Sequence, residues 1–124
     1  MAVIVPDPAQ TDDVTLLSVL VEAPALSRTL YRRGGFEGLE PYVLQILVAL
    51  HRSSGRTVGE LTAELALSQG TVSTALGLLE ERGFVSARAD DADRRRQLQS
   101  ITRLGHRVVR RFMAQARERL TEPD

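Results

Sequence analysis

The chain has 124 residues, of which 43% are hydrophobic and 26% are charged, which is enough for one compact domain with a single core. It contains no cysteine, which excludes disulfides, thiolate metal ligands and a cysteine nucleophile. The 16 basic residues, all arginine, balance the 16 acidic residues, so the net charge alone does not indicate nucleic-acid binding.

The charges are unevenly distributed along the chain. Residues 82–111 contain nine arginines and three aspartates, and the earlier part of the chain carries the balancing acidic residues. A local basic excess is typical of proteins that contact phosphate groups. No apolar run is long enough to cross a bilayer, and the start lacks the pattern of a signal peptide. We therefore expect a cytoplasmic protein with no membrane partner.

The first third of the chain predicts an arm followed by a helix. Residues 1–10 combine a short apolar patch with two prolines, which favours a flexible arm. Residues 11–34 carry an apolar stripe at helical spacing that includes Leu16 and Leu20. Pro24 lies inside this pattern and removes a backbone hydrogen bond, so we expect a kink there.

A second helix is expected from Pro41, because proline suits the first helical position. The residues that follow, up to Leu50, are apolar almost all round, which predicts a central, buried helix. Residues 51–56 are expected to form a loop. Thr57 and Glu60 then have the spacing of a capping box, which places the start of a short third helix at residue 58.

The fourth helix is expected from residue 69 to 82. Ser68 is its candidate N-cap, and Gly83 stands where a helix ends in the left-handed conformation. Its outer face is small and polar. The residues expected to face the core are Val72, Ala75, Leu76 and Leu79.

A hairpin and a last helix complete the pattern. Residues 84–88 and 97–102 read as short strands around a polar tip, residues 89–96. Thr102 is expected to cap a final helix, residues 103–120, with one broad apolar stripe. This stripe consists of Leu104, Val108, Val109, Phe112, Met113, Ala116 and Leu120. Since a lone domain would leave the stripe exposed, we expect it to contribute to a dimer interface.

Together these elements predict a mainly α fold with a small β-hairpin wing, the winged helix-turn-helix. A short helix, a tight turn and a helix with a polar outer face form a helix-turn-helix, whose second helix can enter a DNA major groove. The following hairpin carries Arg94, Arg95 and Arg96 at its tip, where guanidinium groups can reach phosphates or a minor groove. We expect a lobe of residues 41–102 to bind DNA, and residues 11–34 and 103–120 to dimerise.

Several short motifs share one family pattern. They are VGEL at 58–61, LS at 67–68 with TVS at 71–73, LEERGFV at 79–85, DRR at 93–95, and IT at 101–102 with Gly105. On these motifs the stretch from about residue 44 to 105 resembles the MarR family of bacterial transcriptional regulators.

The resemblance implies a homodimer held by its N- and C-terminal helices. The residues expected in this dimer interface are Leu16, Leu20, Leu104, Val108, Phe112 and Leu120. The resemblance implies further that Asp93 pairs with Arg95, that Arg95 enters the minor groove, and that Arg94 and Arg96 contact phosphates. The resemblance also implies that the protein represses a promoter, and that a small aromatic effector of the kind family members bind relieves the repression. Tyr31, Phe36, Tyr42 and Phe112 are either the lining of such a pocket or ordinary core aromatics.

Base recognition by the fourth helix has few candidate residues. No arginine or lysine occurs between Ser68 and Glu81, which is a departure from the family pattern. Only hydrogen bonds from small polar side chains and an apolar contact to a thymine methyl are available. The candidates are Ser68, Gln69, Thr71, Ser73, Thr74 and Leu78. We expect modest sequence discrimination from this helix.

The wing arginines suit either DNA contact or a solvated hairpin tip. Two functional interpretations remain open, because the net charge is zero and no basic residue lies between Ser68 and Glu81 on the recognition helix. The first is the DNA-binding regulator, and the second is a winged helix used for protein interaction or dimerisation with weak DNA binding. An enzyme is not expected, since Ser53, Ser54 and His51 lack an orienting acid and an oxyanion hole. His51 and His106 lack neighbouring carboxylates at ligand spacing, so neither a metal site nor any cofactor is expected.

Overall fold

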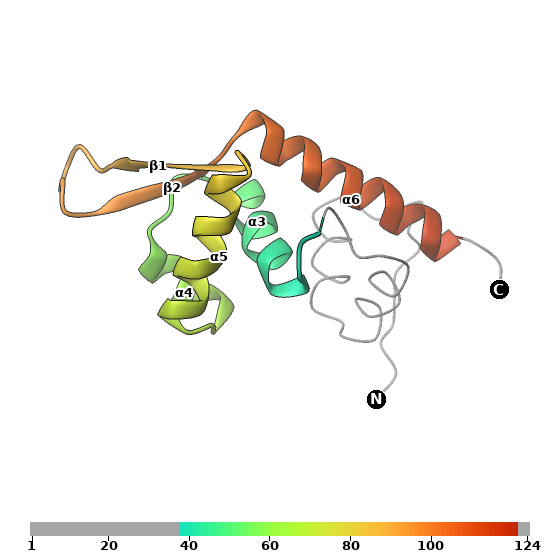
Figure 1. The fold of residues 1–124 in the computed structure, drawn as a ribbon, viewed down its shortest axis with the longest axis horizontal. Coiled ribbons are helices and arrows are strands. Elements are labelled where there is room, and N and C mark those ends of the chain that lie inside the picture. The colour runs from blue at the N-terminus through green and yellow to red at the C-terminus, as the bar shows by residue number, and fades with distance from the viewer. Residues whose placement is uncertain (1–37, 122–124) are drawn as a thin grey trace. The chain divides into compact units, whose positions relative to one another are not determined.

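The computed structural model describes residues 38–121, shown in Figure 1. Contacts divide the chain into two units, one of residues 42–109 and one of residues 1–41 with 110–124. The predicted arm and first helix, with Leu16, Leu20, Pro24, Tyr31 and Phe36, lie outside the described residues. The elements in chain order are α3 (Pro41–Arg52), α4 (Val58–Leu65), α5 (Gln69–Glu81), β1 (Val85–Ala89), β2 (Gln97–Ile101) and α6 (Arg103–Thr121). The predicted mainly α fold with a two-stranded hairpin is confirmed.

Helix α3 is the buried helix that its apolar sequence predicts. Its buried side chains are Val43, Leu44, Ile46, Leu47, Val48, Ala49 and Leu50. The helix continues to Arg52, so the prediction of a loop from residue 51 is wrong by two residues. His51 and Arg52 lie in its last turn, where the positive charge of Arg52 interacts favourably with the helix dipole. The backbone then turns at Gly55, whose φ is 76°.

Helices α4 and α5 begin where their caps predict. The Thr57 side chain accepts from the Glu60 amide, and the Glu60 side chain accepts from the Thr57 amide, which completes the capping box. Ser68 accepts from the Thr71 amide at the start of α5. The helix ends at Glu81, one residue earlier than predicted, and Gly83 follows with a φ of 79°. The predicted inward face is confirmed, since Val72, Ala75, Leu76 and Leu79 are buried.

The hairpin is antiparallel, with Val85 opposite Ile101 and Ala89 opposite Gln97. Its first strand is shifted by one residue from the predicted 84–88, because Phe84 belongs to the turn after α5. Figure 1 shows the hairpin projecting from the helices of the 42–109 unit. A third short segment joins it, since Arg56 forms a β-bridge with Gln99.

The start of α6 is fixed against the turn that follows α5. Thr102 donates its hydroxyl to the Gly83 carbonyl at 2.7 Å and accepts from the Gly105 amide at 3.0 Å. Gly105 packs so tightly that an added Cβ would overlap the Phe84 carbonyl oxygen and lie 2.7 Å from Ile101 Cγ1. Thr102 therefore caps the helix as predicted, and Gly105 requires the absence of a side chain.

The apolar stripe of α6 is mostly buried within the single chain. Val108 is 0% exposed and Phe112 3% exposed, whereas Leu104 is 40% exposed. The expectation that a lone chain exposes this stripe is therefore wrong for Val108 and Phe112, because the chain's own residues cover them. The side chain of Leu120 lies outside the described residues. The participation of α6 in a dimer stays a prediction.

His51 and His106 form a contact that the sequence did not predict. Their Nδ1 atoms are 2.8 Å apart, and their rings meet edge to face, with centroids 4.9 Å apart and planes at 67°. One ring donates its Nδ1 proton to the other. The contact joins the last turn of α3 to the first turn of α6, and both rings are half-buried. Across residues 38–121, no helix has the length and apolar character to cross a membrane.

Candidate nucleic-acid interface

The solvent face of α5 carries small and neutral side chains in its first three turns. Gln69, Ser73 and Thr74 are exposed, as the sequence analysis expected. Gly70 and Gly77 lie on the same face, and a Cβ added to either would meet no atom within 4 Å. No binding role was predicted for these glycines from the sequence. Without side chains they leave the helix backbone accessible to a close neighbour.

Three of the predicted recognition residues are less available than the others. Ser68 Oγ accepts from the Thr71 amide at 3.1 Å and donates to Thr71 Oγ1 at 2.8 Å. These two hydroxyls therefore serve the helix cap. Leu78 and Thr71 are half-buried, so each presents only part of its side chain to a partner. Gln69, Ser73 and Thr74 are left as the main hydrogen-bonding groups of this face.

The tip of the hairpin is a structured turn, built by backbone and aspartate hydrogen bonds. The Asp90 amide donates to the Arg96 carbonyl, and the Arg96 amide to the Asp93 carbonyl, both at 2.9 Å. Asp90 Oδ1 accepts from the Ala92 amide at 3.0 Å, and Asp93 Oδ1 accepts from the Arg95 amide at 3.1 Å. Aspartate often fixes a turn in this way. The aspartates thus shape the loop that presents the arginines.

Asp93 and Arg95 form the pair that the family resemblance implied. Arg95 Nε donates to Asp93 Oδ1 at 3.2 Å, and a second guanidinium nitrogen lies 3.5 Å from Oδ2. The hydrogen bond from the Arg95 side chain, followed by that from its amide, lowers the pKa of the Asp93 carboxyl below its ordinary value. The Arg95 side chain is 91% exposed, so it can meet an anionic partner while it keeps this pair.

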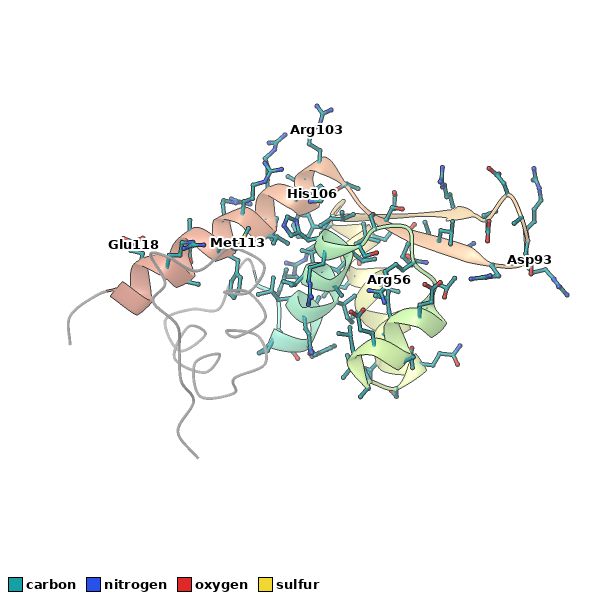
Figure 2. The ribbon with its side chains drawn as sticks, turned by 180° about the vertical axis from the view of Figure 1, so that it is seen from behind. Arg56, Asp93, Arg103, His106, Met113 and Glu118 are labelled. Atoms are coloured by element: carbon teal, nitrogen blue, oxygen red, sulfur yellow. The ribbon has the colours of Figure 1, made fainter. Side chains whose placement is uncertain are left out.

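The other two tip arginines differ from each other. Arg94 is exposed. Arg96 is half-exposed and lies 3.5 Å from Glu60 Oε1 at the start of α4. This contact spans 36 positions of the sequence, and no local pattern in the sequence predicts it. Figure 2 shows Asp93 at the far end of the hairpin from Arg103, which starts α6.

An open groove of about 450 Å³ lies between the start of α4 and the wing. It is lined by Thr57, Val58, Gly59, Arg95, Arg96, Gln97 and Gln99. The start of a helix carries partial positive charge, and the arginines add to it, so this side of the lobe favours an anionic neighbour.

Within residues 38–121, no three His, Cys, Asp or Glu side chains lie close enough to hold a metal ion. Ser54 Oγ accepts from the Ile101 amide at 3.0 Å, which makes it a structural contact between the loop and β2.

The comparisons with known proteins agree with this geometry. The model of the MarR family matches residues 37–96. The resemblance predicted from the sequence motifs is confirmed. The chain is MarR-like. The matched residues include α3, α4, α5 and the wing tip, and the family consists of transcriptional regulators, not enzymes.

Three solved structures illustrate the likeness. A probable transcriptional regulator from Pseudomonas aeruginosa is 28% identical, with a TM-score of 0.69 over 81% of this chain and 75% of its own. A transcriptional regulator from Thermotoga maritima is 26% identical, with a TM-score of 0.65 over 86% and 68%. Streptococcus pneumoniae FabT, solved in complex with DNA, is 23% identical, with a TM-score of 0.62 over 86% and 76%. The comparison with curated proteins finds no match.

Proposed function

We propose that this MarR-like protein is a transcriptional regulator that binds duplex DNA in a sequence-dependent way. One observation carries the proposal: the 42–109 unit presents both a recognition helix with an exposed polar face and a structured wing whose Arg94 and Arg95 are exposed. The first element matches the width of a major groove, and the second has the charge that a minor groove attracts. The DNA complex of Streptococcus pneumoniae FabT supports it by showing this fold in use on DNA.

In this proposal the two elements have different tasks. Gln69, Ser73 and Thr74 hydrogen-bond base edges, and Gly70 and Gly77 let the backbone of α5 lie close to the groove. Arg95, oriented by Asp93, enters the flanking minor groove, and Arg94 neutralises a phosphate. Because the exposed face of α5 carries no charge in its first three turns, most of the salt-dependent affinity comes from the wing.

The regulator acts as a homodimer on a pseudo-palindromic operator in this proposal. Two recognition helices then lie in successive major grooves, about one helical turn apart. Leu104 is 40% exposed on α6 and is available to such an interface. Occupation of a promoter represses transcription, and a small aromatic ligand that changes the spacing of the two helices relieves it.

The test is a fluorescence-anisotropy titration with DNA from upstream of the protein's own gene, against a scrambled duplex, at several salt concentrations. Arg95→Gln is expected to weaken binding about ten-fold or more and to lower the slope of log affinity against log salt by about one. Arg103→Gln is the matched control, because this exposed arginine lies away from the wing tip. Light scattering on the same sample measures the dimer.

Binding of both duplexes at the same weak affinity, with no response to Arg95→Gln, would overturn the proposal. The second candidate, a protein-interaction or dimerisation module, would then be favoured. The observation on its side is the neutral exposed face of the first three turns of α5, which suits a protein surface as well as a groove. A dimer in light scattering together with absent DNA binding is the result that this candidate predicts.

A further inference from the structure

Arg96 differs from Arg95 because its partner lies outside the wing tip, at the start of α4. Glu60 Oε1 accepts from the Thr57 amide at 3.4 Å and from the Thr57 hydroxyl at 3.1 Å. The capping box thus holds this carboxylate at the start of α4. The Arg96 guanidinium lies 3.5 Å from the same oxygen, so Arg96 contacts a carboxylate that the capping box already holds in place.

A second set of contacts joins the same two parts of the lobe. The Arg56 amide donates to the Gln99 carbonyl at 3.0 Å, and the Gln99 amide donates to the Arg56 carbonyl at 2.6 Å. The Arg56 side chain forms an ion pair with Glu64, one turn after Glu60 on α4, and is only 15% exposed. Figure 2 shows Arg56 between α4 and the hairpin. Backbone hydrogen bonds therefore join the stem of the wing to the segment before α4, and the Arg56 ion pair joins that segment to α4.

The tip has a weaker hold than the stem. Residues 90–96 are tied together by their own turn, and the ion pair with Glu60 joins this tip to a helix. Since α4 packs against α5 through a tight turn, any contact that holds the tip on α4 also sets its distance from the recognition helix. A wing held in its binding position loses less conformational entropy when it meets DNA.

We propose that Glu60 and Arg96 form a strut that positions the wing relative to α5, so that Arg96 is a positioning residue and not a phosphate ligand. This inference rests on the proposed DNA binding and refines the sequence-based assignment of Arg96. A carboxylate 3.5 Å from the guanidinium offsets its charge. The attraction of Arg96 for a phosphate is therefore smaller than that of the exposed Arg94.

Glu60→Gln, Arg96→Gln and the double variant test the strut. Glutamine at position 60 keeps the capping box, because it also accepts from the Thr57 amide. Each single variant is expected to bind operator DNA about two- to five-fold more weakly, the range of an exposed ion pair, and the double variant no more weakly than either. The salt slope stays unchanged in Arg96→Gln, since no phosphate contact is lost.

Asp91→Asn separates positioning from long-range charge. Asp91 is an exposed residue of the same tip, so the variant removes one negative charge beside the DNA, as Glu60→Gln does. It is expected to tighten binding slightly, the opposite of Glu60→Gln. A drop of about one in the salt slope of Arg96→Gln, with tighter binding by Glu60→Gln, would make Arg96 a phosphate ligand and overturn the strut.

Amide hydrogen exchange gives a measurement that does not depend on DNA. The Asp90 and Arg96 amides, both hydrogen-bonded in the turn, are expected to exchange faster in both single variants, whereas the Gln99 amide in the stem is unchanged. If the wild-type protein binds no DNA, the proposed function fails and the exchange result alone decides the strut. Unchanged exchange at both tip amides would contradict it.

Discussion

The recognition helix and the wing differ in the side chains that they expose, which are neutral on the first three turns of α5 and charged on the wing tip. Over its first three turns, the exposed face of α5 offers one amide, two hydroxyls and two glycines, with no charge, whereas the wing tip offers exposed guanidinium groups. Hydrogen bonds act only at contact, while charges act over a Debye length of about 8 Å at physiological salt. Sequence reading and salt-dependent affinity are thus carried by different elements, and each can be removed separately.

The two elements also differ in what holds them in place. The inner face of α5 is part of the apolar core, with Val72 and Leu79 both 0% exposed. The wing tip is held by polar contacts of its own turn and by the Glu60 ion pair. A substitution on the tip should therefore change DNA binding with little effect on folding. The contact between Gly105 and the Phe84 carbonyl, where the start of α6 meets the turn after α5, leaves no room for an added atom.

Gly105→Ala is expected to have the largest effect on stability, because it places a methyl group in the contact between Gly105 and Phe84. The new Cβ would overlap the Phe84 carbonyl, a backbone atom that cannot rotate away. We expect a loss of about 3 kcal/mol in the free energy of unfolding, as for other overpacked sites. Urea denaturation followed by circular dichroism measures it. Gly59→Ala is the control, since its Cβ would lie 3.8 Å from Thr57 Oγ1, an ordinary contact; equal midpoints would refute the prediction.

Gln69→Ala is the largest change expected in sequence discrimination. Gln69 is exposed at the first turn of α5, and a glutamine amide can bond an adenine through two hydrogen bonds. We expect a loss of about 2 kcal/mol in operator affinity, no change for a scrambled duplex, and an unchanged salt slope. A comparison with Arg95→Gln in the same titration sharpens the contrast. If Gln69→Ala weakened both duplexes equally, base reading by this residue would be excluded.

Local patterns predicted most of this fold because their physics is local. The capping box at Thr57 and Glu60, the Ser68 cap and the left-handed Gly83 each depend on residues within one turn, and all three are confirmed. The Asp93–Arg95 pair was implied by the family motif. The sequence placed the end of α3 two residues early, since no proline or glycine stands at residue 51 to mark a boundary.

Long-range contacts were beyond prediction from one sequence. The Arg96–Glu60 pair joins residues 36 apart and the His51–His106 pair joins residues 55 apart, and no periodicity links either pair. The burial of Val108 and Phe112 is of the same kind, because helical spacing identifies an apolar face without saying which partner covers it.

Gly77→Ala is expected to change stability and binding in opposite directions. The added Cβ meets no atom within 4 Å, and alanine is the better helix former, so the free energy of unfolding should rise by about 0.5–1 kcal/mol. If α5 approaches DNA as closely as proposed, the same methyl group weakens operator binding by a few-fold. Thermal denaturation and anisotropy on one sample measure both. Higher stability with unchanged affinity would show that this part of α5 does not lie close to the groove.

The smallest expected effect is on the titration of Asp93. Its pKa is lowered first by the Arg95 side chain, then by the Arg95 amide and, more weakly, by the charge of Arg96. For a carboxyl with a lowered pKa, the stabilisation of the pair is complete above the ordinary aspartate range and is lost as the pH falls through the lowered value.

Carboxyl carbon shifts in NMR should therefore place the Asp93 midpoint below that of an ordinary aspartate. Arg95→Gln should raise it more than Arg96→Gln, because Arg96 acts only through its charge. Equal midpoints in the two variants would show that the Asp93–Arg95 hydrogen bond does not form in solution. Because the Asp93 carboxyl stays ionised near neutrality, the wing keeps its geometry there, and the Asp93–Arg95 pair contributes no pH dependence to DNA binding between about pH 6 and 8.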